Sequence, residues 1–61
     1  MKWYTVVKWD TEDETWKPVY VEGVCEYVTE EKAWTLVQAL SRVFPSFRYG
    51  VKDPNGYVST L

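Results

Sequence analysis

The chain has 61 residues, a net charge of -2 and 46% hydrophobic residues, a composition typical of one small globular domain and not of a disordered chain. Its single cysteine excludes an internal disulfide, and the absence of histidine removes the commonest general base and metal ligand. Four Trp, five Tyr and two Phe are more aromatic area than so small a core can bury, because each covers about 150–250 Å².

Two strands are predicted first. Residues 2–9 are rich in β-branched and aromatic types, which favour a strand. The polar residues 10–15 predict a hairpin loop, and residues 16–28 have the composition of a second strand. Within it, Pro18 favours an edge position or the start of the strand, and Gly23 predicts a bulge or bend.

A helix follows. Thr29 can cap its N-terminus, and Glu30 and Glu31 suit the positive end of the helix dipole. Pro45 ends the helix and moves Phe44 away from helical dihedrals. The predicted buried stripe recurs at spacings of three and four residues: Ala33, Leu36, Val37, Leu40, Val43 and Phe44.

Residues 47–52 predict a third strand, with Phe47, Tyr49 and Val51 on one face. The D-P-N-G sequence at residues 53–56 is a strong turn signal, and residues 57–61 form the returning strand. The sequence therefore predicts a single α+β domain over residues 1–61. It has ββαββ order, with one helix on one face of a three- or four-stranded antiparallel sheet whose strand order stays open.

The first hairpin predicts an aromatic sheet face. A symmetric loop would set Trp9 opposite Trp16 and Val6 opposite Val19, although a slip of one residue remains possible. One helix can cover only one face, and the other face is not polar, as an antiparallel sheet facing water would be. Aromatic residues on an uncovered face are typical of an interaction site, whereas loops and helix ends folding over them would make an ordinary wide core.

Acidic residues are concentrated in one part of the chain. Eight of the nine lie between Asp10 and Glu31, where Lys17 is the only base. Such a region can attract a basic partner or imitate nucleic-acid phosphates. The simpler interpretation is a solvated loop and a favourable helix start. The candidate partner-binding residues combine the aromatic face with the acidic loop: Trp3, Trp9, Trp16, Tyr20, Glu12, Asp13 and Glu14.

No catalytic, metal or phosphate-binding motif is present. We therefore expect no enzyme, no cofactor and no metal, and we expect Cys25 to be a small buried side chain. The apolar start is too short for a signal peptide and no run reaches about 18 apolar residues, so we expect a cytoplasmic protein.

The leading hypothesis is a non-enzymatic module that binds a protein partner as an adaptor or inhibitor, or that forms a homodimer. The alternative is single-stranded nucleic-acid binding. Its candidate residues are two sheet aromatics and two bases: Tyr4, Tyr49, Arg48 and Lys52.

Overall fold

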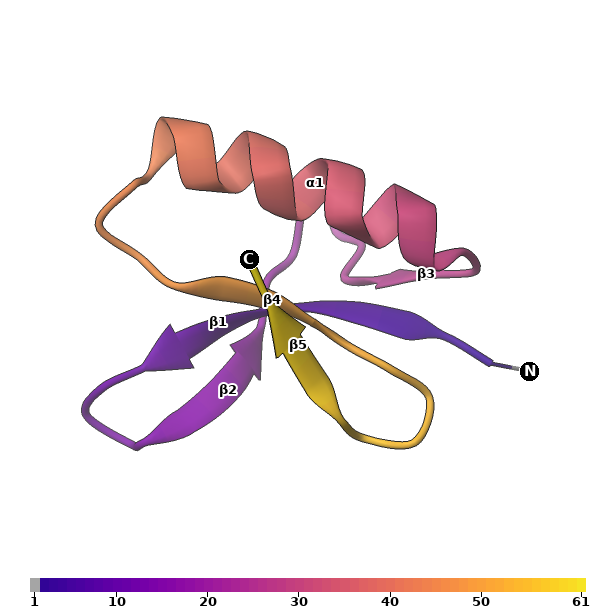
Figure 1. The fold of residues 1–61 in the computed structure, drawn as a ribbon, viewed down its shortest axis with the longest axis horizontal. Coiled ribbons are helices and arrows are strands. Elements are labelled where there is room, and N and C mark those ends of the chain that lie inside the picture. The colour runs from indigo at the N-terminus through magenta and orange to yellow at the C-terminus, as the bar shows by residue number, and fades with distance from the viewer. Residues whose placement is uncertain (1) are drawn as a thin grey trace.

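A computed structural model describes residues 2–61 as a five-stranded antiparallel sheet with a helix across one face (Figure 1). This confirms the predicted α+β class. The elements in chain order are β1 (Tyr4–Asp10), β2 (Thr15–Pro18), β3 (Glu26–Tyr27), α1 (Glu30–Val43), β4 (Tyr49–Lys52) and β5 (Val58–Thr60). No helix within the described residues has the length and apolar character needed to cross a membrane.

The central strand of the sheet is β1. The order β2-β1-β4-β5 places β4 along one side of β1, while β2 and β3 share the other side. The first hairpin pairs Trp9 with Trp16, so the symmetric register is the one adopted. In Figure 1 the β1–β2 and β4–β5 hairpins turn away from the side on which α1 lies.

Local sequence signals determine both ends of α1. The Thr29 hydroxyl accepts a hydrogen bond from the Lys32 amide at 3.3 Å, and Glu30 and Glu31 occupy the first turn. Phe44, before Pro45, has left helical dihedrals at φ -125° and ψ 72°. The predicted cap and stop are both confirmed.

The core lies between α1 and the near face of the sheet. Its buried residues come from both layers: Val6, Tyr49 and Val51 from the strands, and Ala33 and Val37 from the helix. The packed part of the helical stripe ends at Leu40. Val43 and Phe44 are exposed, contrary to prediction, and lie at the C-terminal end of α1, beyond the last residue of the stripe that packs against the core.

The D-P-N-G sequence forms the predicted turn between β4 and β5. The Asp53 side chain accepts hydrogen bonds from the Asn55 and Tyr57 amides, each at 2.9 Å, and Gly56 takes the left-handed conformation at φ 93°. Phe47 lies outside β4 and is exposed, so only Tyr49 and Val51 of the predicted trio reach the core.

The predicted second strand, residues 16–28, is not a single element, and the bend predicted at Gly23 is confirmed by its left-handed conformation at φ 80°. It divides into β2 and β3, which pair with different halves of β1. The interruption at residues 19–25 creates the most unusual local structure in the molecule.

Candidate interaction surface

The chain between β2 and β3 is extruded from the sheet. The Val19 amide donates to the Val6 carbonyl at 2.9 Å, and the Val6 amide donates to the Cys25 carbonyl at 2.9 Å. One β1 residue therefore bonds to two residues that are six positions apart. The intervening segment, residues 20–24, leaves the sheet as an enlarged bulge, here called the extruded hairpin.

The extruded hairpin has its own tight turn. Val21 and Val24 exchange two backbone hydrogen bonds of 2.8 and 3.0 Å. Between them, Glu22 at φ 52° and Gly23 at φ 80° are both left-handed, the arrangement of a two-residue type I′ connection. Glycine adopts this conformation freely, whereas glutamate does so at a cost of about 1–2 kcal/mol.

Tyr27 attaches the extruded hairpin to the body of the protein. Its ring packs against the core, and its hydroxyl donates to the Val24 carbonyl at 3.2 Å. Burial raises the pKa of Tyr27, as expected for a phenol in partly apolar surroundings. The hairpin is thus a held structure and not a loose loop.

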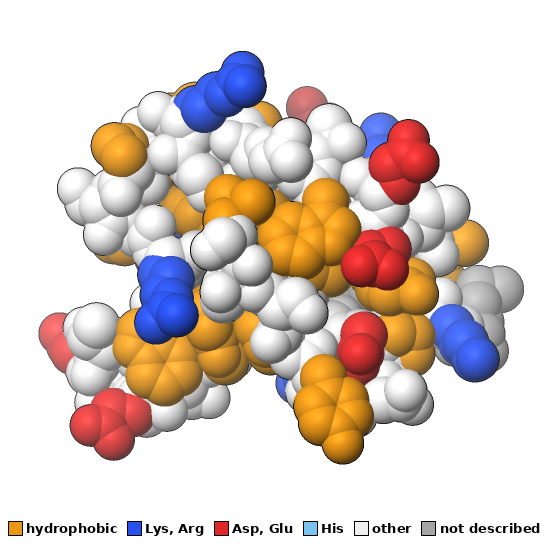
Figure 2. Space-filling view, in the orientation of Figure 1, with side chains coloured by type: hydrophobic (Ala, Val, Ile, Leu, Met, Phe, Trp, Pro, Cys, Tyr) orange, Lys and Arg blue, Asp and Glu red, His pale blue; other side chains and the backbone are white. Residues whose placement is uncertain are grey.

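Three large apolar side chains gather beside this hairpin. Trp3, Tyr20 and Val24 are 38%, 66% and 46% exposed. They border a shallow depression of about 360 Å³, which Gly23, Cys25 and Glu26 complete. We call Trp3, Tyr20 and Val24 the Trp3–Tyr20 patch. On the side of the molecule seen in Figure 2, hydrophobic side chains also reach the surface below α1, around the β1–β2 and β4–β5 hairpins.

Acidic groups flank the patch. Glu22 forms the turn of the extruded hairpin, and Glu26 lines the depression. Cys25 also lines the depression and is half-buried, so the expectation of a buried cysteine was wrong. Hydrogen bonding to Cys25 is the main cause that raises the pKa of Tyr20.

A second aromatic group lies at the tip of the β1–β2 hairpin. Trp9 and Trp16 form an edge-to-face pair with ring centroids 5.2 Å apart and an interplanar angle of 66°. Both are half-buried. Such pairs contribute about 0.5–1.5 kcal/mol beyond burial, so much of the role of these two tryptophans is to hold the hairpin together.

The acidic loop beside them is internally ordered. One Asp10 carboxylate oxygen accepts from the Glu12 amide at 2.9 Å and from the Asp13 amide at 3.2 Å. Lys17 forms an ion pair with the other Asp10 oxygen at 2.9 Å and a second ion pair with Asp13. Hydrogen bonding to Lys17, followed by the loop amides, lowers the pKa of Asp10. Two of the loop acids are therefore already paired, and Glu12 and Glu14 are exposed.

The seven predicted partner-binding residues thus divide into two groups. Trp3 and Tyr20 share the depression beside the extruded hairpin. Trp9 and Trp16, with the acidic residues 12–14, lie at the other end of β1, about 20 Å away at 3.4 Å per residue. The prediction missed Val24, Cys25 and Glu26 as neighbours of Tyr20. The only sequence signal for this arrangement was Gly23, which predicted a bulge or bend.

The four residues of the nucleic-acid alternative do not share a surface. Tyr49 is buried beneath α1 and Tyr4 is half-buried on the same face, whereas Lys52 and Arg48 are exposed. A base cannot stack on a tyrosine that the helix covers. This set of residues was therefore wrongly grouped, because alternation does not show which face the helix takes.

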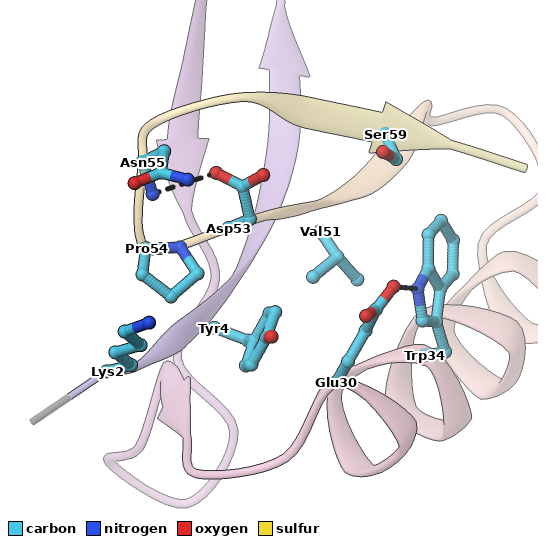
Figure 3. A pocket seen from close by; sticks show the side chains of 9 residues that line it. All are labelled: Lys2, Tyr4, Glu30, Trp34, Val51, Asp53, Pro54, Asn55 and Ser59. Atoms are coloured by element: carbon cyan, nitrogen blue, oxygen red, sulfur yellow. Dashed lines mark hydrogen bonds between the residues drawn. The ribbon is translucent and has the colours of Figure 1, made fainter.

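A depression lies between α1 and the β4–β5 turn (Figure 3). It has a volume of about 210 Å³, with Tyr4 and Val51 among its lining residues. The Trp34 indole donates to the Glu30 carboxylate at 3.1 Å, and the turn amides occupy one Asp53 oxygen. These contacts occupy Glu30, Trp34 and Asp53 within their own elements, while Lys2, Tyr4 and Ser59 also line the depression.

A larger depression, of about 580 Å³, lies between the acidic loop and residues 46–48. The Lys8 ammonium lies 4.4 Å from the centroid of the Phe47 ring. The ring centroids of Phe44 and Phe47 are 6.4 Å apart. The sequence did not predict this cluster, because Phe47 was assigned to a strand face shared with Tyr49 and Val51. Like the others, it is an open surface feature and not an enclosed cavity.

No group of three or more potential metal ligands occurs among residues 2–61. No protein-family model, curated protein or solved structure significantly matches the chain.

Proposed function

We propose that this protein is a non-enzymatic interaction module that binds a protein partner through the Trp3–Tyr20 patch. The observation that carries the proposal is the gathering of three exposed apolar side chains around one depression. Tryptophan and tyrosine are the residues that most often supply binding energy at protein interfaces.

The cost of the extruded hairpin supports this proposal. It interrupts the pairing of β1, holds Glu22 in a left-handed conformation and exposes Tyr20 and Val24. A continuous strand would have avoided all three penalties. Local strain that does not serve the core is often kept where it serves recognition.

The charges around the patch favour one kind of ligand. Glu22 and Glu26 stand beside apolar side chains, so the patch suits a bulky apolar residue flanked by lysine or arginine. A partner with acidic flanks would place like charges together. We therefore expect the protein partner to present a basic segment around an apolar anchor.

The test is a calorimetric titration with two peptides that share a central tryptophan, one with lysine and one with glutamate at the flanking positions. We expect the basic peptide to bind more tightly, and Trp3→Ala or Tyr20→Ala to weaken it about 30-fold, the effect of removing a side chain worth about 2 kcal/mol.

Tyr57→Ala is the matched control, because Tyr57 is equally aromatic and exposed but lies next to β5. Equal weakening by Tyr20→Ala and Tyr57→Ala would contradict the proposal, as would chemical-shift changes confined to the β1–β2 tip.

A further inference from the structure

The strand β5 is an open edge of the sheet. It is last in the order β2-β1-β4-β5, and α1 packs over β1, β3 and β4. The Tyr57 carbonyl accepts from the Asp53 amide at 2.8 Å, so it points toward β4. The side to which a residue's N–H and C=O groups point alternates along a strand. The N–H and C=O groups of Ser59 therefore point toward β4, and those of Val58 and Thr60 point outward.

The outward edge has one of the features that normally protect a strand from pairing, its short length, and lacks the others. Residues 54–61 contain no charged side chain, whereas edges are usually blocked by lysine, an inward-pointing charge or proline within the strand. Tyr57 and Leu61, at the two ends of β5, are 74% and 69% exposed. The edge is therefore short, apolar and free to form hydrogen bonds.

We propose that a second copy of this chain pairs with β5 in antiparallel register, with the two-fold axis at Ser59. This register sets Val58 opposite Thr60 of the second copy and Thr60 opposite Val58. Both are hydrogen-bonded pairs, so all four outward groups on each copy are used. An axis at Val58 would set Thr60 opposite Gly56, whose amide already donates to the Asp53 carbonyl within the turn at 3.0 Å.

The side chains fit the same register. With the axis at Ser59, Tyr57 of each copy lies opposite Leu61 of the other, as a non-hydrogen-bonded pair in which side chains approach closely. No like charges meet, because the segment carries none. The two-fold axis is perpendicular to the sheet, so both helices lie on the same side of a continuous sheet, as expected for a self-complementary interface.

The contact is small compared with the roughly 1,600 Å² of a standard interface. We therefore expect a weak dimer, with a Kd above about 1 µM. This surface is separate from the Trp3–Tyr20 patch, so a variant that removes the patch should still dimerise.

Sedimentation equilibrium over about 10 µM to 1 mM tests the dimer, with concentrations set by that affinity. Thr60→Pro removes an outward amide that no β4 residue uses, and it should raise the Kd at least tenfold. Trp3→Ala is the control and should leave the Kd unchanged. A single-chain mass for the wild type at 1 mM would overturn the proposal.

Charge substitution tests the register without relying on proline. Tyr57→Lys with Leu61→Lys places like charges opposite each other and should abolish the dimer. Tyr57→Lys with Leu61→Glu creates two opposite-charge pairs and should recover it. The interface would lie elsewhere, and the proposal would be overturned, if the dimer survives the double-lysine change. The proposal would also be overturned by two results together: the lysine–glutamate variant stays monomeric, and Trp3→Ala alone dissociates the wild-type dimer.

Discussion

At the scale of single residues, two glutamates adopt a conformation that glutamate disfavours. Glu14 and Glu22 have φ values of 53° and 52°. Asparagine tolerates the left-handed region better, so Glu14→Asn and Glu22→Asn should each stabilise the protein by about 0.5–1 kcal/mol. Urea unfolding measures the gain. Glu12→Asn is the control, since it makes the same chemical change in the same loop without a positive φ; an equal gain there would show that charge and not backbone strain is responsible.

The Asp10–Lys17 pair predicts how stability depends on pH. Lys17 lowers the pKa of Asp10 in the folded protein from its usual value of 3.8, so the contribution of the pair is present above about pH 4 and is lost as the pH falls through the folded pKa. Asp10→Asn keeps a side-chain oxygen for the loop amides and removes only the charge. Its destabilisation should therefore be largest near pH 7 and shrink on acidification.

Urea unfolding of the wild type and Asp10→Asn at pH 7, 4 and 2.5 checks this, with Glu12→Gln as the control for simple loss of one charge. A stability difference that does not change with pH would show that Asp10 acts through its backbone hydrogen bonds alone. At the alkaline end the sign reverses: Asp13 and Asp10 raise the pKa of Lys17, so its contribution is lost only as the pH rises above about 10.5.

At the scale of elements, β4 and β5 depend on a glycine at their closest approach. A Cβ on Gly50 would lie 2.6 Å from the Ser59 carbonyl oxygen and 3.0 Å from a Val58 methyl carbon. Gly50→Ala should therefore destabilise the protein by about 1–3 kcal/mol and separate β5 from β4. Hydrogen exchange should show lost protection at Ser59, whose amide faces β4.

Gly23→Ala is the control for this substitution. A Cβ there meets nothing within 4 Å, and only its φ of 80° is unfavourable, so it should lower stability without opening β5. Unchanged exchange at Ser59 in Gly50→Ala would mean that the strands can move apart slightly and keep their hydrogen bonds.

The elements that the sequence predicted well are those with local signals. The helix has a capping Thr29 and a terminating Pro45, and the β4–β5 turn has an Asp, a Pro and a Gly at the positions where each is physically required. The β2–β3 interruption has one such signal, Gly23. Its partner in the turn is Glu22, a residue that a type I′ turn rarely uses, and the valines on both sides resemble an uninterrupted strand.

The candidate surface was less predictable because it depends on that interruption. Extending the β1–β2 register would set Tyr20 opposite Thr5, but Glu26 occupies that position. Tyr20 instead lies with Val24 beside Trp3. The Trp9–Trp16 pair could be predicted, since it needs only the loop length, whereas a contact that crosses an extruded segment requires the three-dimensional fold.

At the scale of the whole molecule, the sheet separates three surfaces. These surfaces are the Trp3–Tyr20 patch and the acidic tip, which lie at opposite ends of β1, and the open edge at β5. The helix covers one face of the sheet. Because each surface rests on different residues, partner binding and self-pairing can be removed independently. The extruded hairpin is the part whose removal should leave the core intact.

The register specifies how to remove it. Val7 pairs with Pro18, and Thr5 pairs with Glu26. These two pairs are two residues apart along β1 but eight residues apart along the opposite chain. The opposite chain therefore contains six residues more than a continuous strand would need. Deleting residues 20–25 joins Val19 to Glu26 and makes one continuous strand with every side chain on its present face. The lost Tyr27 hydrogen bond costs about 0.5–1.5 kcal/mol, which release of the Glu22 strain offsets.

We therefore expect this deletion variant to unfold cooperatively with a stability close to that of the wild type, and to lose binding of the basic peptide while it still dimerises. Deleting only residues 20–24 is the matched control: the strand would slip by one residue, turn Glu26 toward the core and lose most of its stability. Circular dichroism during thermal unfolding distinguishes the two variants. If both fail to fold, the extruded hairpin belongs to the core of the protein, and its exposed side chains need no partner to explain them.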